Sequence, residues 1–169
     1  GASSEFTFDG ATITVTGLLA GDHVYELTTA DNTYKFIGCA YEVGITSATE
    51  LEAWRLAGEQ SFAVLLNDIE YDGSAKPNGV FHYGSLDGRG YTIKNFAVQG
   101  GFIVRLWSDT SVFRNVKFVN AVKDCSGNTN IGFLGQWNKG IMENLYVDVT
   151  LSNSDEKQAS VLVCSDGCL

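Results

Sequence analysis

The sequence predicts an all-β protein whose C-terminal two-thirds coil into a short parallel β-helix, and three observations lead to this fold class. The chain of 169 residues contains 19 Gly and one Pro. A six-residue pattern recurs along it, and a second apolar motif recurs with a similar period. Gly, Asn and Asp tolerate positive φ, so the frequent turns that they form favour many short strands over long helices.

The six-residue pattern consists of an apolar residue, a polar residue, Asn or Asp, an apolar residue, any residue and an apolar residue. It occurs at residues 66–71, 93–98, 113–118 and 142–147, and its Asx positions are Asp68, Asn95, Asn115 and Asn144. Each interval between them is long enough for one three-sided turn of a coil. Because Asn and Asp enter the left-handed region readily, we expect them at equivalent corners of the coil, stacked into one ladder of side chains. Successive turns then lie about 4.8 Å apart.

The second motif supports the same coil. It occurs at Gly101-Phe102-Ile103, Gly132-Phe133-Leu134 and Val161-Leu162-Val163, at nearly equal intervals. Two strand registers that share one period predict a coil of about four turns. The alternative is an antiparallel β-sandwich with regular turns, because alternating strands and turn signals fit that fold as well.

The N-terminal part of the chain has a different pattern. Alternating segments at residues 6–8, 12–16, 24–27 and 34–37 are separated by turn signals and predict two β-hairpins. Ser47-Ala48-Thr49-Glu50 is a capping box, which predicts a helix over 48–57 that stops at Gly58. We expect this helix to cover the open end of the coil. The predicted organisation is a hairpin module or cap over residues 1–44 and a parallel β-helix over residues 45–169.

The segment from Ile45 to about Gly167 resembles the GLUG-type repeat region of bacterial surface proteins, within the pectate-lyase-like superfold. The stretch Gly84-Ser85-Leu86-Asp87-Gly88-Arg89-Gly90-Tyr91-Thr92-Ile93-Lys94-Asn95 is similar to the hallmark of that family. Gly132-Phe133-Leu134-Gly135 matches the motif that names the repeat, whereas the other two copies lack one or both of its glycines. The resemblance implies a right-handed β-helix in a secreted or cell-attached, adhesin-like chain. It implies no activity, because function must be argued from a site.

The charge and the cysteines exclude several functions. A net charge of −9 opposes binding to nucleic acid or to an anionic membrane surface. No apolar stretch approaches the roughly 20 residues of a membrane span. Four cysteines allow two disulfides in three pairings, or free thiols: Cys39, Cys125, Cys164 and Cys168. Both histidines lie far from the Cys164-to-Cys168 pair in sequence, so we expect no metal site and no cofactor.

No catalytic constellation is evident. The outward positions before the Asx corners include Lys94, Arg114 and Glu143, which we interpret as a solvated ladder of charges rather than an acid and base pair. Asp87 is interpreted as the turn residue of an Asp-Gly pair.

Two tryptophans suggest a binding surface. Trp107 and Trp137 occupy similar places, just after successive copies of the Gly-Phe motif. We expect their indoles on adjacent turns, with Asp109 and Asn138 beside them, as a platform for sugar rings. The alternative is that both indoles pack under a corner or against the next turn.

These observations predict a non-catalytic module for adhesion or glycan contact, extracellular or on the cell surface, and part of a longer chain. Its partner is a glycan or another cell-surface ligand. One alternative is a fragment of a polysaccharide lyase or glycoside hydrolase, which requires clustered acids in a groove. The other is a structural spacer, which requires neither a groove nor exposed aromatic residues.

Overall fold

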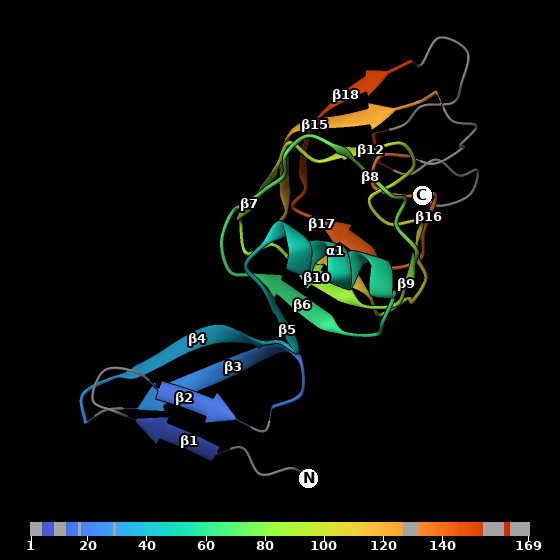
Figure 1. The fold of residues 1–169 in the computed structure, drawn as a ribbon. Helices are drawn as coiled ribbons and strands as arrows, with labels where there is room; N and C mark the ends of the chain where they lie inside the picture. The colour runs from blue at the N-terminus through green and yellow to red at the C-terminus, as the bar shows by residue number, and fades with distance from the viewer. Residues whose placement is uncertain are drawn as a thin grey trace. The chain divides into compact units, whose positions relative to one another are not determined.

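The chain folds into two compact units, residues Gly1–Glu42 and Val43–Leu169. The computed structural model describes residues 5–8, 13–16, 18–28, 30–126, 132–153 and 161–162. Figure 1 shows antiparallel ribbons in the first unit and, in the second, short strands that wind into a coil beside a helix. Within the described residues, no helix has the length and apolar character for crossing a bilayer.

The first unit contains the two hairpins that the sequence predicts. Strands β1 (Glu5–Phe8) and β2 (Ile13–Thr16) pair antiparallel, and so do β3 (Gly21–Thr28) and β4 (Thr33–Ala40). On the second hairpin, Glu26 lies opposite Lys35, and the Lys35 Nζ is 3.2 Å from a Glu26 carboxylate oxygen. Opposite charges across a strand pair support this register.

The second unit consists of three parallel sheets. The first sheet contains, in spatial order, β17 (Ile141–Glu143), β14 (Val112–Arg114), β10 (Ser85–Asp87), β6 (Phe62–Leu65) and β5 (Val43–Ile45). The second contains β7 (Ile69–Glu70), β11 (Thr92–Lys94), β15 (Lys117–Asp124), β12 (Ala97–Val98) and β8 (Ala75–Lys76), with β18 (Tyr146–Ser152) paired to β15. The third contains β16 (Trp137–Asn138), β13 (Arg105–Leu106) and β9 (Phe81–His82).

The three sheets stack successive turns of one coil, so the predicted parallel β-helix is confirmed. We call each turn a rung: the first rung holds β6 to β9, the second β10 to β13, the third β14 to β16, and the last described rung β17 and β18. Three rungs have strands in all three sheets and the last has strands in two, so the coil has about three turns, where the sequence predicts about four. Every strand pair described in this unit is parallel, which rules out the antiparallel sandwich.

The helix α1 (Ala48–Ala57) covers the N-terminal end of the coil. Ser47 caps it by accepting a hydrogen bond from the Glu50 backbone N–H, and Gly58 ends it with a φ of 66°. Both bounds agree with the capping box and the glycine stop. Leu51 and Trp54 are buried in the core, and Arg55 is completely buried. Together they close the first end of the coil.

Aromatic rings fill the centre of the coil. The rings of Phe96, Phe102 and Phe118 meet edge to face or tilted, and Phe102 and Phe118 have centroids 5.1 Å apart. Such contacts add to the gain from area burial. The second sequence motif holds these rings in register, since the Phe102 N–H donates to the Phe133 carbonyl over 2.7 Å. Val163 lies outside the described residues, but Leu162 continues the register by accepting from the Leu134 N–H.

The Asx corners form two rows instead of the single row predicted. Asn115 and Asn144 are left-handed, with φ of 55° and 51°, and follow equivalent strands β14 and β17. Asn95 is also left-handed, with φ of 57°, but it follows β11 at the next corner of the coil. The prediction of one common row was therefore wrong for Asn95.

The cause is the corner after β10. There the chain turns through Gly88-Arg89-Gly90, with positive φ at Arg89 and Gly90. The six-residue pattern consequently falls one strand later in the second rung than in the others. Asp68 lies at the first corner, where its carboxylate accepts from the Thr92 N–H over 2.9 Å. This hydrogen bond, followed by the nearby Lys94, lowers the pKa of Asp68.

Candidate functional site

The outer face of the sheet β9–β13–β16 carries a cluster of aromatic and basic side chains. Register places Phe81, Arg105 and Trp137 in one column across the three strands, and His82, Leu106 and Asn138 in the next. The second column faces the core, because His82 and Leu106 are 0% and 1% exposed. The alternation of a strand then turns Phe81 and Arg105 outward.

Trp107 lies at the centre of this cluster. Its ring is nearly parallel to that of Phe81, with an interplanar angle of 14° and centroids 6.2 Å apart. The Arg105 guanidinium lies 4.6 Å from the Phe81 centroid and 5.3 Å from the Trp107 centroid, and the Lys139 Nζ lies 4.5 Å from that of Trp107. Because β13 is the central strand, the indole has an aromatic neighbour on one side and a cation on the other.

The four residues predicted as a ligand platform are not all brought together. In the backbone register Trp137 pairs with Arg105. The neighbour of Trp107 on the next rung is Lys139, which contacts its ring. Asn138 shares the inward column, and its Oδ1 is buried with no hydrogen-bond partner among the described residues. Asp109 is exposed in the turn between β13 and β14.

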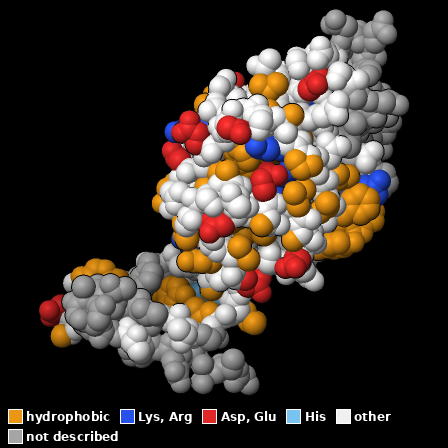
Figure 2. Space-filling view, viewed as in Figure 1, with side chains coloured by type: hydrophobic (Ala, Val, Ile, Leu, Met, Phe, Trp, Pro, Cys, Tyr) orange, Lys and Arg blue, Asp and Glu red, His pale blue; other side chains and the backbone are white. Residues whose placement is uncertain are grey.

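The structure adds residues that the sequence reasoning missed. Phe81 and Tyr83, in strand β9 and just after it, are 45% and 44% exposed. Figure 2 shows hydrophobic side chains gathered on the side where Figure 1 labels β9 and β16, next to a basic side chain. Phe81 pairs with Arg105 across the rungs. The separation of these two residues along the chain is shorter than the Gly-Phe period, so a search based on that period did not align them. We call Phe81, Tyr83, Arg105, Trp107 and Lys139 the aromatic face.

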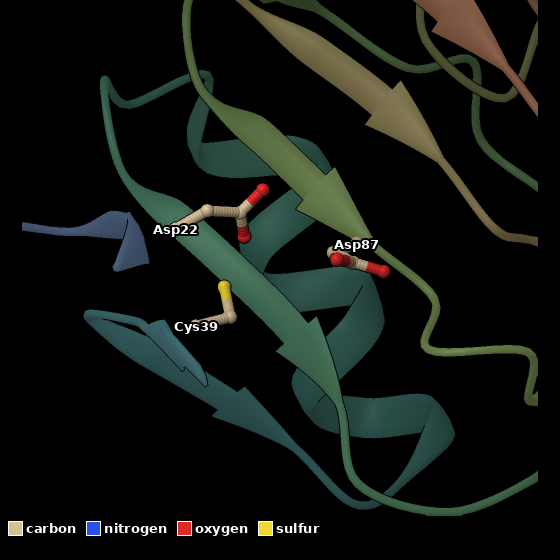
Figure 3. A group of neighbouring side chains, drawn as sticks. All are labelled: Asp22, Cys39 and Asp87. Carbon is tan, nitrogen blue, oxygen red and sulfur yellow. The ribbon is translucent and has the colours of Figure 1, made fainter. Parts of the chain in front are cut away.

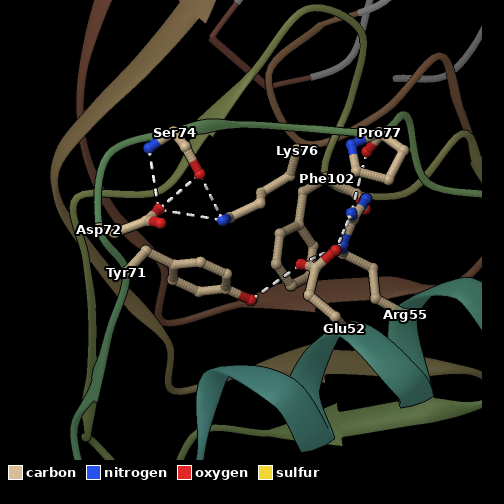
Figure 4. A network of polar contacts seen from close by, with 8 residues as sticks. All are labelled: Glu52, Arg55, Tyr71, Asp72, Ser74, Lys76, Pro77 and Phe102. Atoms are coloured by element: carbon tan, nitrogen blue, oxygen red, sulfur yellow. Dashed lines mark hydrogen bonds and ion pairs between the residues drawn. The ribbon is translucent and has the colours of Figure 1, made fainter.

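A hollow in the surface lies beside α1. It has a volume of about 430 Å³ and is lined by Ala48, Thr49, Glu52, Glu70, Tyr71, Asp72 and Lys76. Figure 4 shows the Tyr71 hydroxyl pointing at Glu52, with Arg55 behind it and Lys76 reaching toward Asp72. The Tyr71 hydroxyl donates to Glu52 Oε1 over 2.9 Å, and Arg55 Nε donates to the same oxygen over 2.9 Å. Arg55 Nη1 and Nη2 donate further to the carbonyls of Phe102 and Pro77.

Two of the three acidic residues that line this hollow are paired with cations, Glu52 with Arg55 and Asp72 with Lys76. Burial, with the negative charge of Glu52 as a second cause, raises the pKa of Tyr71. Hydrogen bonds from Ser74 and then Lys76 lower the pKa of Asp72, so this carboxylate stays ionised and is no proton donor near neutral pH. The Lys76 ammonium also lies 5.6 Å from the Tyr71 ring centroid. The arrangement anchors α1 and the first rung to each other.

The predicted row of charges is partly formed. Asp87, Arg114 and Glu143 lie opposite one another on β10, β14 and β17. Arg114 Nε is 2.9 Å from Asp87 Oδ2, whereas its Nη1 is 4.0 Å from Glu143 Oε1. Lys94 belongs to the second sheet instead, where its Nζ is 3.4 Å from Asp68. Of the predicted ladder only Arg114 and Glu143 are neighbours, and Asp87 takes the place of Lys94 beside them. The row is solvated only at Glu143, because the Asp87 and Arg114 side chains are 7% and 18% exposed.

Asp87 is a turn residue, as the sequence predicts. Its Oδ1 accepts from the backbone N–H of Arg89 over 2.8 Å and from the Asn115 amide over 3.0 Å. Figure 3 draws it with Asp22 and Cys39, which are cross-strand partners on the hairpin of the first unit. Asp87 is engaged within its own unit, and we assign no metal site to these three side chains. Cys164 and Cys168 lie outside the described residues.

His82 has a structural role. Its Nε2 is 3.0 Å from the Trp54 carbonyl, and its Nδ1 accepts from the Gly84 N–H over 3.2 Å. This pair of contacts requires the neutral tautomer with the proton on Nε2. Burial lowers the pKa of His82, against the weaker opposite effect of the bond to Trp54.

No protein-family model, curated protein or solved structure matches the chain, so these sites are interpreted from their geometry alone.

Proposed function

We propose that the chain is a non-catalytic, extracellular module that contacts glycans through the aromatic face. The observation that carries this proposal is the exposed pair of Phe81 and Tyr83 rings on a rigid parallel sheet, next to the stacked Trp107. Flat apolar rings bind the C–H faces of sugars, and neighbouring polar groups fix orientation. The two cations beside these rings, Arg105 and Lys139, supply donors for sugar oxygens.

The backing of the face supports this role. The inward residues His82 and Leu106 are buried and hold the strands from behind. Backbone hydrogen bonds tie the face across rungs, from Trp107 N–H to the His82 carbonyl over 2.9 Å and from Lys139 N–H to the Leu106 carbonyl over 2.9 Å. A preorganised surface binds a ligand without a large ordering cost.

The proposal is tested by affinity electrophoresis and glycan-array binding of single variants. We expect Phe81→Ala and Tyr83→Ala each to weaken binding about tenfold, the effect of removing one aromatic anchor. The matched control is Tyr91→Ala, since Tyr91 is 37% exposed but lies at the corner between β10 and β11. Circular dichroism melts should show all three variants folded.

Two outcomes contradict the proposal. If the parent chain binds no glycan, or if Tyr91→Ala weakens binding as much as Phe81→Ala, the aromatic face is not the contact surface. Release of reducing or unsaturated sugar ends from a polysaccharide would instead favour the lyase or hydrolase alternative. That activity would direct attention to Glu52, Glu70 and Asp72 beside α1.

A further inference from the structure

The two ends of the coil differ in how they are closed. At the first end α1 covers the core, with Leu51 at 0% and Trp54 at 6% exposure. At the other end β17 pairs with β14 alone and β18 pairs with β15 alone, among the residues that the structure describes. In the described part of the chain, the outer edges of these two strands have no strand beside them, so their backbone N–H and C=O groups can pair with a further strand.

Residues 5–153, where they are described, cover the inward side chains of the last rung on one side only. Phe113 and Phe118 on the third rung are 2% and 0% exposed. Their register partners on the last rung, Met142 and Val147, are only partly buried, although both pack against the core. The last rung therefore presents apolar surface that each earlier rung hides under the next one.

The Asn amides at the corners of the coil donate toward the preceding rung, whereas the Gln99 amide donates forward to Ser126. The Asn115 Nδ2 donates back to Asp87, and the Asn144 Nδ2 donates back to the Asn115 Oδ1 over 3.1 Å. At the next corners, Asn120 donates back to Asn95 over 2.6 Å and Asn153 donates back to Asp124 over 2.8 Å. At these corners, the Asn amide of each rung therefore donates to the rung before it. The last described rung consequently ends in oxygen acceptors.

The charges follow the same order. Along the first sheet the row runs from Asp87 to Arg114 to Glu143, so its sign alternates from negative to positive to negative. Arg114 is closely paired with Asp87, and its distance of 4.0 Å to Glu143 leaves that carboxylate 49% exposed. Asp148 is the other charged residue of β17 and β18, and it is acidic too. The edge that these two strands form is therefore acidic.

We infer that this last rung binds an extended polypeptide strand that carries a basic residue followed by Asn at the corner position. Such a strand adds one more rung by parallel pairing with β17 and β18. Its basic side chain meets Glu143 and its Asn amide donates to the Asn144 Oδ1, which continues both the charge row and the amide row. A second copy packed against it through the same end fits less well, because that arrangement would place Glu143 and Asp148 against the same acidic residues of the copy.

A peptide that copies residues 112–123 has the required chemistry, since it contains the pair Arg114-Asn115. We would measure its binding to the full chain by fluorescence anisotropy at low ionic strength. The control peptide differs only by the Arg114→Glu change, which places a carboxylate opposite Glu143. We expect the parent chain to bind the basic peptide about threefold more tightly than the control, the scale of one cross-strand charge pair.

The decisive variant is Glu143→Arg, at a site exposed enough to accept the change. It should reverse the preference, so that the Arg114→Glu peptide binds more tightly. A peptide with N-methyl groups on the pairing face of its backbone should bind neither protein, because the strand pairing needs those N–H groups. The inference is overturned if neither peptide binds, if Glu143→Arg leaves the preference unchanged, or if sedimentation shows that the parent chain dimerises through this end.

Discussion

Replacing Arg55 by Met tests the account of the covered end of the coil. The Arg55 side chain is 0% exposed and makes an ion pair with Glu52, whose side chain is 19% exposed. It also donates to the carbonyls of Phe102 and Pro77 and lies 5.3 Å from the Phe96 centroid. Methionine matches the aliphatic length but carries no donor. The Glu52 carboxylate then loses its cation and keeps only the Tyr71 hydroxyl as a donor, and two carbonyls lose the Arg55 N–H groups.

Breaking a buried pair by removing one partner typically costs about 3–5 kcal/mol, and we expect Arg55→Met to fall in that range. The matched control is Lys94→Met in the same unit, because the pair of Lys94 and Asp68 is 42% and 50% exposed. Exposed pairs contribute about 0–1 kcal/mol. The assay is urea unfolding followed by circular dichroism at neutral pH.

A double variant separates the charge effect from packing. Adding Glu52→Gln to Arg55→Met removes the carboxylate charge that has lost its cation. The double variant should therefore have a higher free energy of unfolding than Arg55→Met alone. The reasoning is refuted if Arg55→Met costs no more than Lys94→Met. It is also refuted if Glu52→Gln makes the Arg55→Met protein still less stable.

Two further predictions concern the Asn corner and the buried histidine. Asn115→Gly and Asn115→Ala both lose the amide hydrogen bonds, but only Ala is strained at a φ of 55°. Urea unfolding should therefore show Asn115→Ala less stable than Asn115→Gly by about 1 kcal/mol. Equal stabilities of the two variants would contradict the left-handed corner. Burial lowers the pKa of His82, so the neutral imidazole contributes to the stability of the fold. This contribution is fully present at pH values above the unfolded-state pKa near 6.5, and it falls as the pH drops toward the folded-state pKa. Melts between pH 7.5 and 5.5 should lose stability with a slope of at most about 1.4 kcal/mol per pH unit for one proton, and His82→Gln should flatten that slope.

Much of the fold was readable from local patterns. The capping box at Ser47 and the glycine at 58 set both ends of α1, because capping depends on residues within one turn of the helix. The two N-terminal hairpins followed from alternation and turn residues. The Gly-Phe motif predicted the pairing of Phe102 with Phe133, since both copies occupy the same place in neighbouring rungs.

The candidate site was only partly readable, because it depends on register between rungs of unequal length. Trp107 and Trp137 occupy similar places after their Gly-Phe motifs, yet Trp137 lies opposite Arg105 and the ring of Trp107 contacts Lys139. A small shift in the length of chain between strands is invisible to a motif search, but it decides which side chains meet. Phe81 was missed for the same reason.

Short strands with left-handed Asn corners can be predicted from local sequence, because they follow from the side chains and backbone of a few adjacent residues. Which corners stack depends on packing between rungs, since the turn at Gly88-Arg89-Gly90 moves Asn95 into a different row from Asn115. Tertiary packing also decided that Arg55 is buried and that the last described rung ends in acceptors and carboxylates. These features arise from contacts between residues far apart in the chain, where no local pattern specifies the partner.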